Sequence, residues 1–240
     1  MRLEGKVIIV TGSTTGIGKA IAKRCVAEGA KVVIHGLEEN LGLDVLAELG
    51  SEHAVFLQAD IADENCPERL VKIALDTFGR LDSVVNNAAW VVTSNVENTS
   101  RAFLQKLLDI NTIFPFLLIQ KALPELTKNK GCVLNIGSVN AWSGEPNLLA
   151  YSISKGGLMT MTRNLGDALI RDYGVRVNQI NPGWVLTERE RERKKEHGLS
   201  ETWYEGLPDI YAPAGRILWP EEIAAAVIYW LSDEAGPISG

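Results

Sequence analysis

Short apolar runs alternate along the whole chain with longer stretches in which apolar residues recur every three to four positions. Runs such as VIIV (7–10) and KVVI (31–34) lack polar alternation, which is typical of strands that are covered on both faces. These runs predict six strands: Lys6–Val10, Lys31–His35, Ala54–Gln58, Ser83–Asn86, Cys132–Ile136 and Val175–Ile180.

The longer stretches predict helices between the strands, and Pro220 stands at a position that suits the start of the last one. The expected helices are Gly18–Glu28, Glu38–Leu49, Glu64–Phe78, Ala102–Thr127, Tyr151–Asp172 and Glu221–Leu231. Strand–helix alternation predicts parallel strands joined by right-handed crossovers. We therefore expect an α/β fold in which a doubly wound parallel sheet carries helices on both faces.

One charged segment, Glu188–Glu196, departs from this pattern because it reads ERERERKKE. Its mixed signs argue against an arm that binds nucleic acid and predict a solvated helix. It opens a stretch, 188–218, that shows little core pattern. We expect this stretch to form a flexible lid within a single domain that spans residues 1–240.

Composition narrows the class of protein. The chain has 240 residues, with 24 Lys+Arg against 30 Asp+Glu, so an acidic balance argues against nucleic acid as the main partner. No apolar run approaches the roughly 18 residues of a membrane span, and the apolar run near the N-terminus is too short for a secretory signal. Three widely spaced cysteines, Cys25, Cys66 and Cys132, suggest neither a disulfide framework nor a metal site, and are typical of reduced thiols in a cytoplasmic protein.

A glycine-rich turn, TGSTTGIGK (11–19), joins the first strand to the first helix. Such glycines permit a tight turn, a close approach of the backbone to a pyrophosphate, and close packing of the helix on the strand. The helix N-terminus then offers free N–H groups to an anion. The spacing Gly-x3-Gly-x-Gly differs from that of nucleotide triphosphatases, so the turn predicts a dinucleotide site instead.

The end of the second strand should contact the adenosine ribose, where an acid favours NAD and an arginine favours NADP. This chain has HGLEE at 35–39, with no acid at the tip of the strand and no arginine beside it. Thr14, Thr15 and His35 are candidate donors to a 2′-phosphate. The negative charges of Glu38 and Glu39, in contrast, would repel such a phosphate. The residues leave both NAD and NADP open.

A tyrosine and a lysine lie four residues apart in Tyr151-Ser152-Ile153-Ser154-Lys155, on one face of the predicted helix. The Lys155 ammonium is therefore expected near the Tyr151 hydroxyl, where it lowers a phenol pKa that is ordinarily about 10. Such a tyrosine acts as a general acid or base. Ser138 lies just after the end of the fifth strand, where the ligand crevice of a parallel sheet lies, and is placed to donate to the same substrate oxygen.

In these residues the chain resembles the short-chain dehydrogenases/reductases, NAD(P)-dependent oxidoreductases with a single Rossmann-type domain. The resemblance covers nearly the whole chain, although Ala89 stands where the family pattern has glycine. It is carried by the loop Thr11–Gly18, Asp60, Asn86-Asn87-Ala88-Ala89, Asn111, Ser138, Tyr151, Lys155, Pro182-Gly183 and Thr187.

The resemblance implies a role for each matched residue. Tyr151 would exchange a proton with the substrate oxygen, Lys155 would lower the pKa of Tyr151 and hold the nicotinamide ribose, and Ser138 would orient the carbonyl. Asn111 would hold a water that connects Lys155 to solvent. Asp60 would accept from the adenine amino group. The implied cofactor contacts are Gly12, Ser13, Thr14, Thr15, Gly16, Ile17, Gly18, Gly36, Leu37, Asp60, Ile61, Asn87, Ala88, Tyr151, Lys155, Pro182, Gly183, Val185 and Thr187.

Aromatic residues follow three of the predicted strands at the expected site face, namely Trp90, Trp142 and Trp184. With Asn140 they are candidates for an aromatic-lined pocket that binds a sugar ring, an alicyclic ketone or an aromatic ketone. The alternative is that these rings cap the core or pack beneath the lid.

The predicted function is hydride transfer between NAD(P) and a secondary alcohol or carbonyl, with no role for a metal. A module that senses NAD(P) without catalysis, and an epimerase or dehydratase, are the alternatives. The resemblance also implies a homodimer or homotetramer that pairs Ala102–Thr127 and Tyr151–Asp172 across a four-helix contact. It further implies a seventh strand after the segment at which this chain stops, Gly240.

Overall fold

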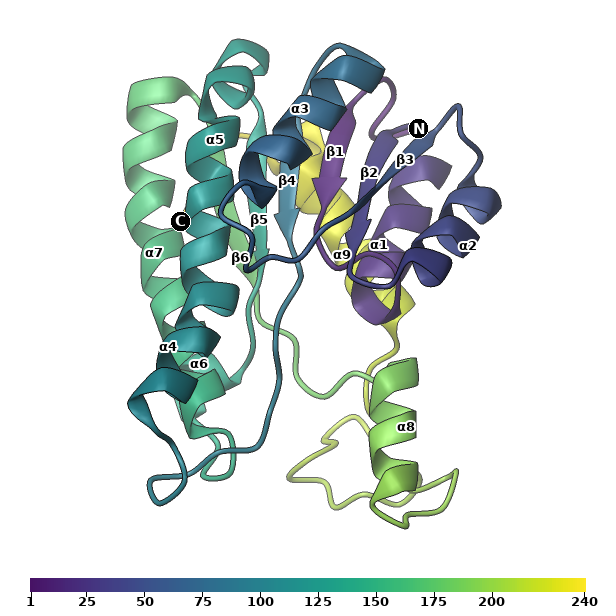
Figure 1. The fold of residues 1–240 in the computed structure, drawn as a ribbon, viewed down its shortest axis with the longest axis vertical. Coiled ribbons are helices and arrows are strands. Elements are labelled where there is room, and N and C mark those ends of the chain that lie inside the picture. Colours follow the sequence, from purple (N-terminus) through teal and green to yellow (C-terminus); the bar gives the residue numbers. More distant parts are fainter.

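A computed structural model describes residues 1–240 as one six-stranded parallel sheet with helices on both faces (Figure 1). The strand order β3-β2-β1-β4-β5-β6 places the switch in winding direction between β1 and β4. The predicted α/β fold is thus confirmed. The strands are β1 (Val7–Val10), β2 (Lys31–Gly36), β3 (Ala54–Gln58), β4 (Ser83–Asn86), β5 (Cys132–Ile136) and β6 (Arg176–Ile180).

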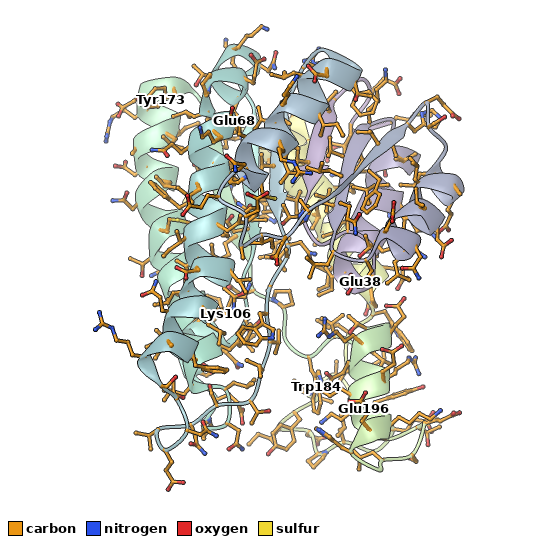
Figure 2. All side chains as sticks on the ribbon, viewed as in Figure 1. Glu38, Glu68, Lys106, Tyr173, Trp184 and Glu196 are labelled. Carbon is orange, nitrogen blue, oxygen red and sulfur yellow. The ribbon has the colours of Figure 1, made fainter.

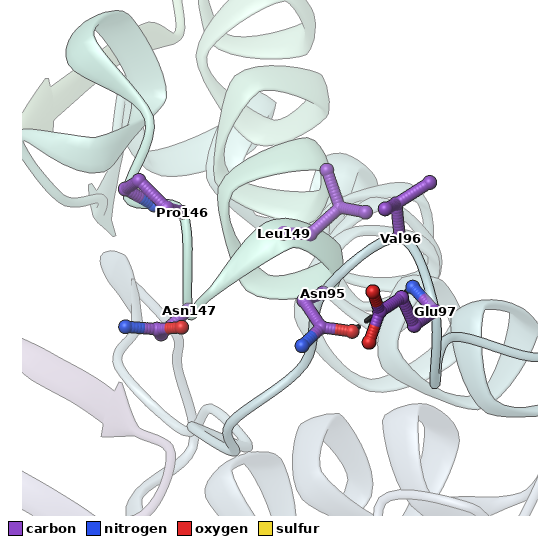
Figure 3. Close-up of a pocket in the computed structure, with 6 residues that line it drawn as sticks. All are labelled: Asn95, Val96, Glu97, Pro146, Asn147 and Leu149. Carbon is purple, nitrogen blue, oxygen red and sulfur yellow. Dashed lines mark hydrogen bonds between the residues drawn. The ribbon is translucent and has the colours of Figure 1, made fainter.

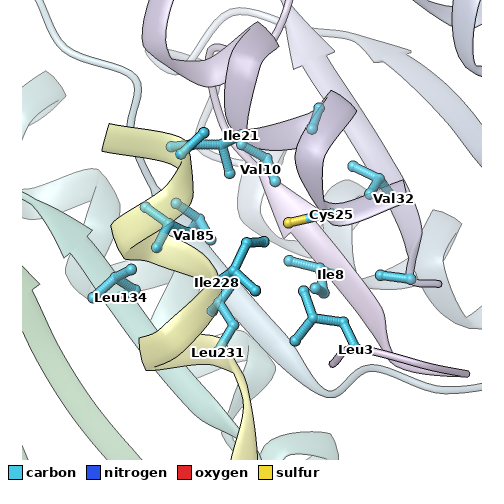
Figure 4. Close-up of a cluster of buried hydrophobic side chains, with 14 of the residues drawn as sticks. Leu3, Ile8, Val10, Ile21, Cys25, Val32, Val85, Leu134, Ile228 and Leu231 are labelled. Atoms are coloured by element: carbon cyan, nitrogen blue, oxygen red, sulfur yellow. The ribbon is translucent and has the colours of Figure 1, made fainter. Parts of the chain in front are cut away.

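Continuous apolar strands bury both of their faces, as β1 illustrates. Ile8 and Val10 enter one hydrophobic cluster, whereas Val7 and Ile9 enter the cluster on the opposite face of the sheet. Figure 4 shows the first cluster, which α1 and α9 close. The main helices are α1 (Gly16–Ala27), α2 (Glu39–Leu49), α3 (Cys66–Phe78), α4 (Arg101–Leu108), α5 (Phe114–Asn129), α7 (Leu149–Tyr173) and α9 (Pro220–Leu231).

The helix predicted over Ala102–Thr127 is interrupted. A π-helical turn, η1 (Asp109–Ile113), separates α4 from α5. The whole stretch Arg101–Asn129 is long and apolar enough to cross a membrane by length and composition. Its buried residues, among them Phe114, Leu118 and Ala122, pack against the sheet as those of a core helix do.

The charged segment forms α8 (Glu188–Glu196), with the predicted bounds, and projects from the body of the molecule (Figure 1). A bridge between Val185 and Leu218 closes the base of this excursion. Three buried residues of this excursion and its base, Leu186, Ala212 and Ile217, form a small hydrophobic cluster, against which Trp184, Trp203, Tyr204 and Leu207 pack.

Short elements complete the chain. They are α6 (Asn140–Ser143), between β5 and α7, and the 3-10 turn η2 (Asp233–Ala235) after α9. The last residues lie against β6, where the Gly240 N–H donates to the Val177 carbonyl at 2.9 Å.

Candidate active site

The glycine-rich loop lies where β1 and β4 meet and leads into α1. Gly12 has φ +62°, and a Cβ there would lie 2.9 Å from the Cα of Ala88. A Cβ on Gly18 would overlap the Gly12 carbonyl oxygen. Because this cradle has no room for side chains and ends at a helix N-terminus, its residues fit the pyrophosphate of a dinucleotide.

Asn87 and Thr11 fasten this loop to the end of β4. The Asn87 side-chain amide donates to the carbonyls of Thr11 at 2.9 Å and Gly12 at 3.0 Å. The Thr11 hydroxyl accepts from the N–H groups of Asn87 at 3.0 Å and Ala88 at 3.1 Å. Two segments more than 70 residues apart in the chain are thereby held at one edge of the sheet.

His35 does not face the site in the way the sequence suggests. It is buried, and its Nδ1 accepts from the Gly12 N–H at 3.3 Å, so the proton sits on Nε2, which faces the Cys66 Sγ at 3.7 Å. Burial lowers the pKa of His35 to about 4. The expectation that His35 donates to a 2′-phosphate is therefore wrong, because both ring nitrogens are already engaged below the loop.

Three hydroxyl residues of the loop, Ser13, Thr14 and Thr15, differ in their surroundings. Ser13 is fully buried and its hydroxyl donates to the Val10 carbonyl at 2.7 Å, so it supports the loop from within. Thr14 is also buried and lies against Gly36. A Cβ added to Gly36 would lie 2.7 Å from the hydroxyl oxygen of Thr14. Leu37 and Thr15 are exposed at this edge. No side-chain bond from Thr15 caps α1.

Ser138 and Tyr151 come together at the end of β5. The Ser138 N–H donates to the Asn181 side chain at 3.1 Å, and the Ser138 Oγ accepts from the Asn140 N–H at 3.2 Å. Tyr151 is buried in the first turn of α7. Burial raises its pKa, while a side-chain hydrogen bond with Ser138 lowers it.

Lys155 is buried one turn farther along α7, and its Nζ lies 5.8 Å from the centroid of the Tyr151 ring. The ammonium donates to the Ile136 carbonyl at 2.7 Å, so it is held at the end of β5. Burial lowers the pKa of Lys155 to about 8. Because burial outweighs the hydrogen bond with Ser138, the pKa of the Tyr151 phenol is raised, and its acidification by Lys155 stays a prediction.

Asn111 occupies the π-turn η1, and its side chain is fully engaged. The amide donates to the Trp90 carbonyl and to the Ser154 Oγ, both at 3.0 Å, and its oxygen accepts from the Trp90 N–H at 2.8 Å. Ser154 in turn donates to the Tyr151 carbonyl at 2.7 Å. A π-turn of this kind is frequent at functional sites. Here it ties the end of β4, η1 and the start of α7 into one unit.

The segment after β6 returns to the glycine-rich loop. Pro182 accepts from the Val139 N–H at 3.1 Å, and Val185 is buried at the base of the excursion. Thr187 caps α8 by accepting from the Glu190 N–H at 3.2 Å. A Cβ on Gly16 would come within 3.1 Å of the Thr187 methyl, so this segment lies directly on the loop.

Comparisons with known proteins identify the family of the chain. A family profile described as enoyl-(acyl carrier protein) reductase matches residues 12–240. The chain is 38% identical to glucose 1-dehydrogenase 2 of Bacillus subtilis, over 99% of this chain and 92% of that protein. It is 36% identical to an NADP-dependent (R)-specific alcohol dehydrogenase of Lentilactobacillus kefiri, over 98% of this chain and 92% of that protein.

A solved structure is similar to this chain in its fold. The 3-ketoacyl-(acyl-carrier-protein) reductase of Brucella melitensis, complexed with NADH, matches with a TM-score of 0.85 and 29% identity, over 99% of this chain and 95% of that one. The chain belongs to the short-chain dehydrogenase/reductase family. It is an NAD(P)-dependent oxidoreductase that takes hydride from the CH–OH group of a small molecule or adds hydride to the corresponding carbonyl.

The tryptophans of this dehydrogenase/reductase do not line one common wall. Trp90 packs against the cluster that contains Tyr151, with its ring centroid 5.4 Å from that of Phe103. Trp142, on α6, is 61% exposed. Trp184 lies beside α8 (Figure 2), where its ring centroid is 5.0 Å from that of Trp203. Trp184 therefore packs with residues of the excursion 188–218, and a contact with substrate stays a prediction.

On the adenosine side, Asp60 and Ile61 follow β3. The Asp60 carboxylate accepts from the Ala62 N–H at 2.9 Å, and Ile61 packs against the core. The Asn86 side-chain amide donates to the Asn135 Oδ1 at 2.9 Å, which links β4 to β5, and the Asn86 Oδ1 is buried without a partner.

Sequence reasoning missed two positioning residues of this family member, Asn181 and Ser154. Both touch a catalytic candidate through hydrogen bonds. Ser154 was detectable, because a residue three positions after Tyr151 shares its helix face.

A pocket of about 410 Å³ lies nearby between the loops before α4 and α7 (Figure 3). It is lined by Asn95, Val96, Glu97, Pro146, Asn147 and Leu149, none of which is a predicted site residue.

Proposed function

We propose that Tyr151, Lys155, Ser138 and Asn111 carry the reaction of this oxidoreductase, and that its substrate is a secondary alcohol or the corresponding carbonyl. The observation that supports this most is the buried pair of Tyr151 and Ser138, with the Lys155 ammonium 5.8 Å from the tyrosine ring. These groups stand at the same sheet edge as the glycine cradle. That edge is where open α/β sheets bind ligands.

In this proposal the nicotinamide, when bound, supplies or accepts the hydride. The Tyr151 hydroxyl gives a proton to the carbonyl oxygen during reduction, and the Tyr151 phenolate takes the proton of the alcohol during oxidation. Ser138 donates to the same oxygen and orients it. Lys155 has a pKa lowered to about 8 by burial, so it exchanges protons close to neutral pH and replenishes the site. The Asn111 side chain is engaged with Trp90 and Ser154, so it acts by fixing the turn beside Lys155.

The cofactor cradle consists, in the proposal, of main-chain groups more than of side chains. Its residues are Gly12, Ser13, Thr14, Thr15, Gly16, Ile17, Gly18, Gly36, Leu37, Asp60, Ile61, Asn87, Ala88, Pro182, Gly183, Val185 and Thr187, with Tyr151 and Lys155 at the nicotinamide end. Ser13 contributes by shaping the loop, because its hydroxyl is bound to the Val10 carbonyl.

We further propose that NAD is preferred to NADP. His35 is neutral and buried, and the end of β2 carries the carboxylates of Glu38 and Glu39. The guanidinium of Arg69, which follows β3, is engaged with Asp63 at 3.3 Å and with the Gln58 carbonyl at 3.3 Å. No cation at the end of β2 is therefore free to neutralise a 2′-phosphate.

The excursion 188–218 acts as the lid of the single domain 1–240 in this proposal. Its own hydrophobic cluster makes it a unit that moves as a body on the Val185–Leu218 base. Trp90, Asn140, Trp142 and Trp184 are the substrate-side candidates. Trp142 is the one whose ring is free to contact a substrate, since it is 61% exposed.

We also propose a homodimer or homotetramer in the cytoplasm. Three large apolar side chains on the π-turn, α5 and α7 stay 40–43% exposed, namely Ile113, Phe116 and Ile153. A second copy that pairs these helices would cover them. Light scattering should give a multiple of the 26.2 kDa chain mass, and Phe116→Glu should shift the mass toward one chain. A wild-type monomer at micromolar concentration refutes this assembly.

The experiment that tests the function has two stages. Titration with NADH and NADPH, followed by tryptophan fluorescence, should give a dissociation constant that is lower for NADH. A panel of secondary alcohols and ketones is then assayed with that cofactor, using wild type and Tyr151→Phe. Full activity in Tyr151→Phe refutes the proposed mechanism. Tight cofactor binding with no turnover over the whole panel favours a sensor instead.

A further inference from the structure

A carboxylate from a distant part of the chain lies on the anion-binding end of α1. Glu188, the first residue of α8, accepts a hydrogen bond from the Gly16 N–H, with its Oε2 at 3.1 Å. The two residues are 172 positions apart, and Glu188 reaches the loop because Thr187 packs on Gly16. Figure 1 shows the start of α8 close to the start of α1.

The N-terminal end of α1 has no acidic side chain of its own. Its first turn contains no acidic residue, and Thr15 makes no side-chain capping bond. Lys19, in the same turn, points away from the loop to Glu48 at 3.4 Å. The free N–H groups and the positive end of the helix dipole therefore attract one carboxylate, which α8 supplies.

We propose that Glu188 is an internal competitor of the cofactor pyrophosphate and so sets the affinity of this enzyme for dinucleotides. The proposal rests on the proposed cofactor cradle. A pyrophosphate needs the N–H groups at the start of α1, and two anions do not share them without repulsion. Binding of the dinucleotide therefore displaces the Glu188 side chain, which links occupancy of the cradle to the position of the first turn of α8.

The neighbouring acids of α8 play no such part, which gives a matched control. Glu190 turns inward and accepts from the Trp184 ring nitrogen at 3.0 Å. Glu192 is exposed, one turn farther from the loop, and makes no hydrogen bond or ion pair with another side chain. Glu192→Gln thus removes the same charge from the same helix without touching the contact.

The test measures binding of ADP-ribose and of adenosine by calorimetry in wild type, Glu188→Gln, Glu188→Ala and Glu192→Gln. Because Glu188 is exposed, loss of its charge should tighten ADP-ribose binding by about two- to fivefold. Adenosine, which has no phosphate, should bind all four proteins equally. Glu188→Ala, which keeps no acceptor, should tighten ADP-ribose binding at least as much as Glu188→Gln. Thermal melts check that each variant is folded.

The outcomes separate this inference from the proposed function. Unchanged ADP-ribose binding in both Glu188 variants overturns the competition, as does an equal gain in Glu192→Gln or an equal gain for adenosine. Failure of the wild type to bind either ADP-ribose or NADH overturns the cofactor cradle itself. Tighter binding of ADP-ribose that is confined to the Glu188 variants supports both.

Discussion

His35 makes the stability of this protein depend on pH in a way that one substitution isolates. Burial lowers its pKa from an ordinary value of 6.5 to about 4, although Asp60 nearby acts in the opposite direction. Between about pH 4 and pH 6.5, the imidazole of His35 is therefore protonated in the unfolded chain and neutral in the folded chain. The stabilisation is complete above pH 6.5 and is lost as pH falls toward 4. Linkage over this interval gives a loss of about 2 kcal/mol between pH 7 and pH 5.

His35→Asn tests this magnitude because the amide oxygen of asparagine replaces Nδ1 as the acceptor for the Gly12 N–H. Urea unfolding of both proteins is measured from pH 7.5 to pH 5. Wild type should be more stable at pH 7, because the ring fills the space beside Phe114 and Cys66, and this advantage should shrink by about 2 kcal/mol at pH 5.

The control is His53→Asn, which makes the same change at an exposed histidine. It should leave the pH dependence as in wild type. A stability difference between wild type and His35→Asn that stays constant with pH refutes the reasoning, because a buried neutral histidine must produce this slope.

Three further predictions concern the site. Tyr151→Phe should lower kcat by at least about a hundredfold, because the proton donor is lost, and leave the dissociation constant of NADH within a few-fold of wild type; fluorescence titration and steady-state rates measure both. Lys155→Met should abolish turnover yet raise the free energy of unfolding at pH 7 by about 1–3 kcal/mol. The reason is that the burial which lowers the pKa of Lys155 to about 8 opposes the charge of its ammonium. Unfolding in urea measures this, and a variant less stable than wild type contradicts it. Gly18→Ala should lose cofactor binding and melt several degrees lower, as its Cβ overlaps the Gly12 carbonyl, whereas Gly156→Ala, with one atom at 3.8 Å, should melt no lower than wild type.

Strands were predictable here because burial on both faces leaves a direct record in the sequence. Three strands begin and end at the predicted residues, and the other three differ by one residue at one end. The π-turn was not predictable. The apolar pattern runs through Asp109–Ile113 without a break, and the contacts that hold the turn come from Trp90 and Ser154, which lie elsewhere in the chain.

Spacing and motifs nominate the candidate catalytic residues, but the electrostatics of these residues were not predictable from the sequence. Spacing alone places Lys155 near Tyr151, yet the direction of the ammonium is set by the Ile136 carbonyl on another element. Likewise, a histidine at the end of β2 looks like a phosphate donor until its burial beneath the loop is known. Such properties depend on what lies above and below a residue, which a one-dimensional pattern does not contain.

Several polar residues at this sheet edge bind main-chain groups just where a strand ends. Lys155 donates to the Ile136 carbonyl, His35 accepts from the Gly12 N–H, and Asn87 donates to the Thr11 carbonyl. A parallel strand that stops leaves such groups without a ladder partner, and burial makes an unpaired group costly. Polar side chains at the strand ends are therefore needed for folding before they are needed for chemistry. This explains why apolar runs are followed at once by polar residues at the candidate site. It also explains why the protein is expected to gain stability only when Lys155 is replaced, since burial opposes the charge of Lys155.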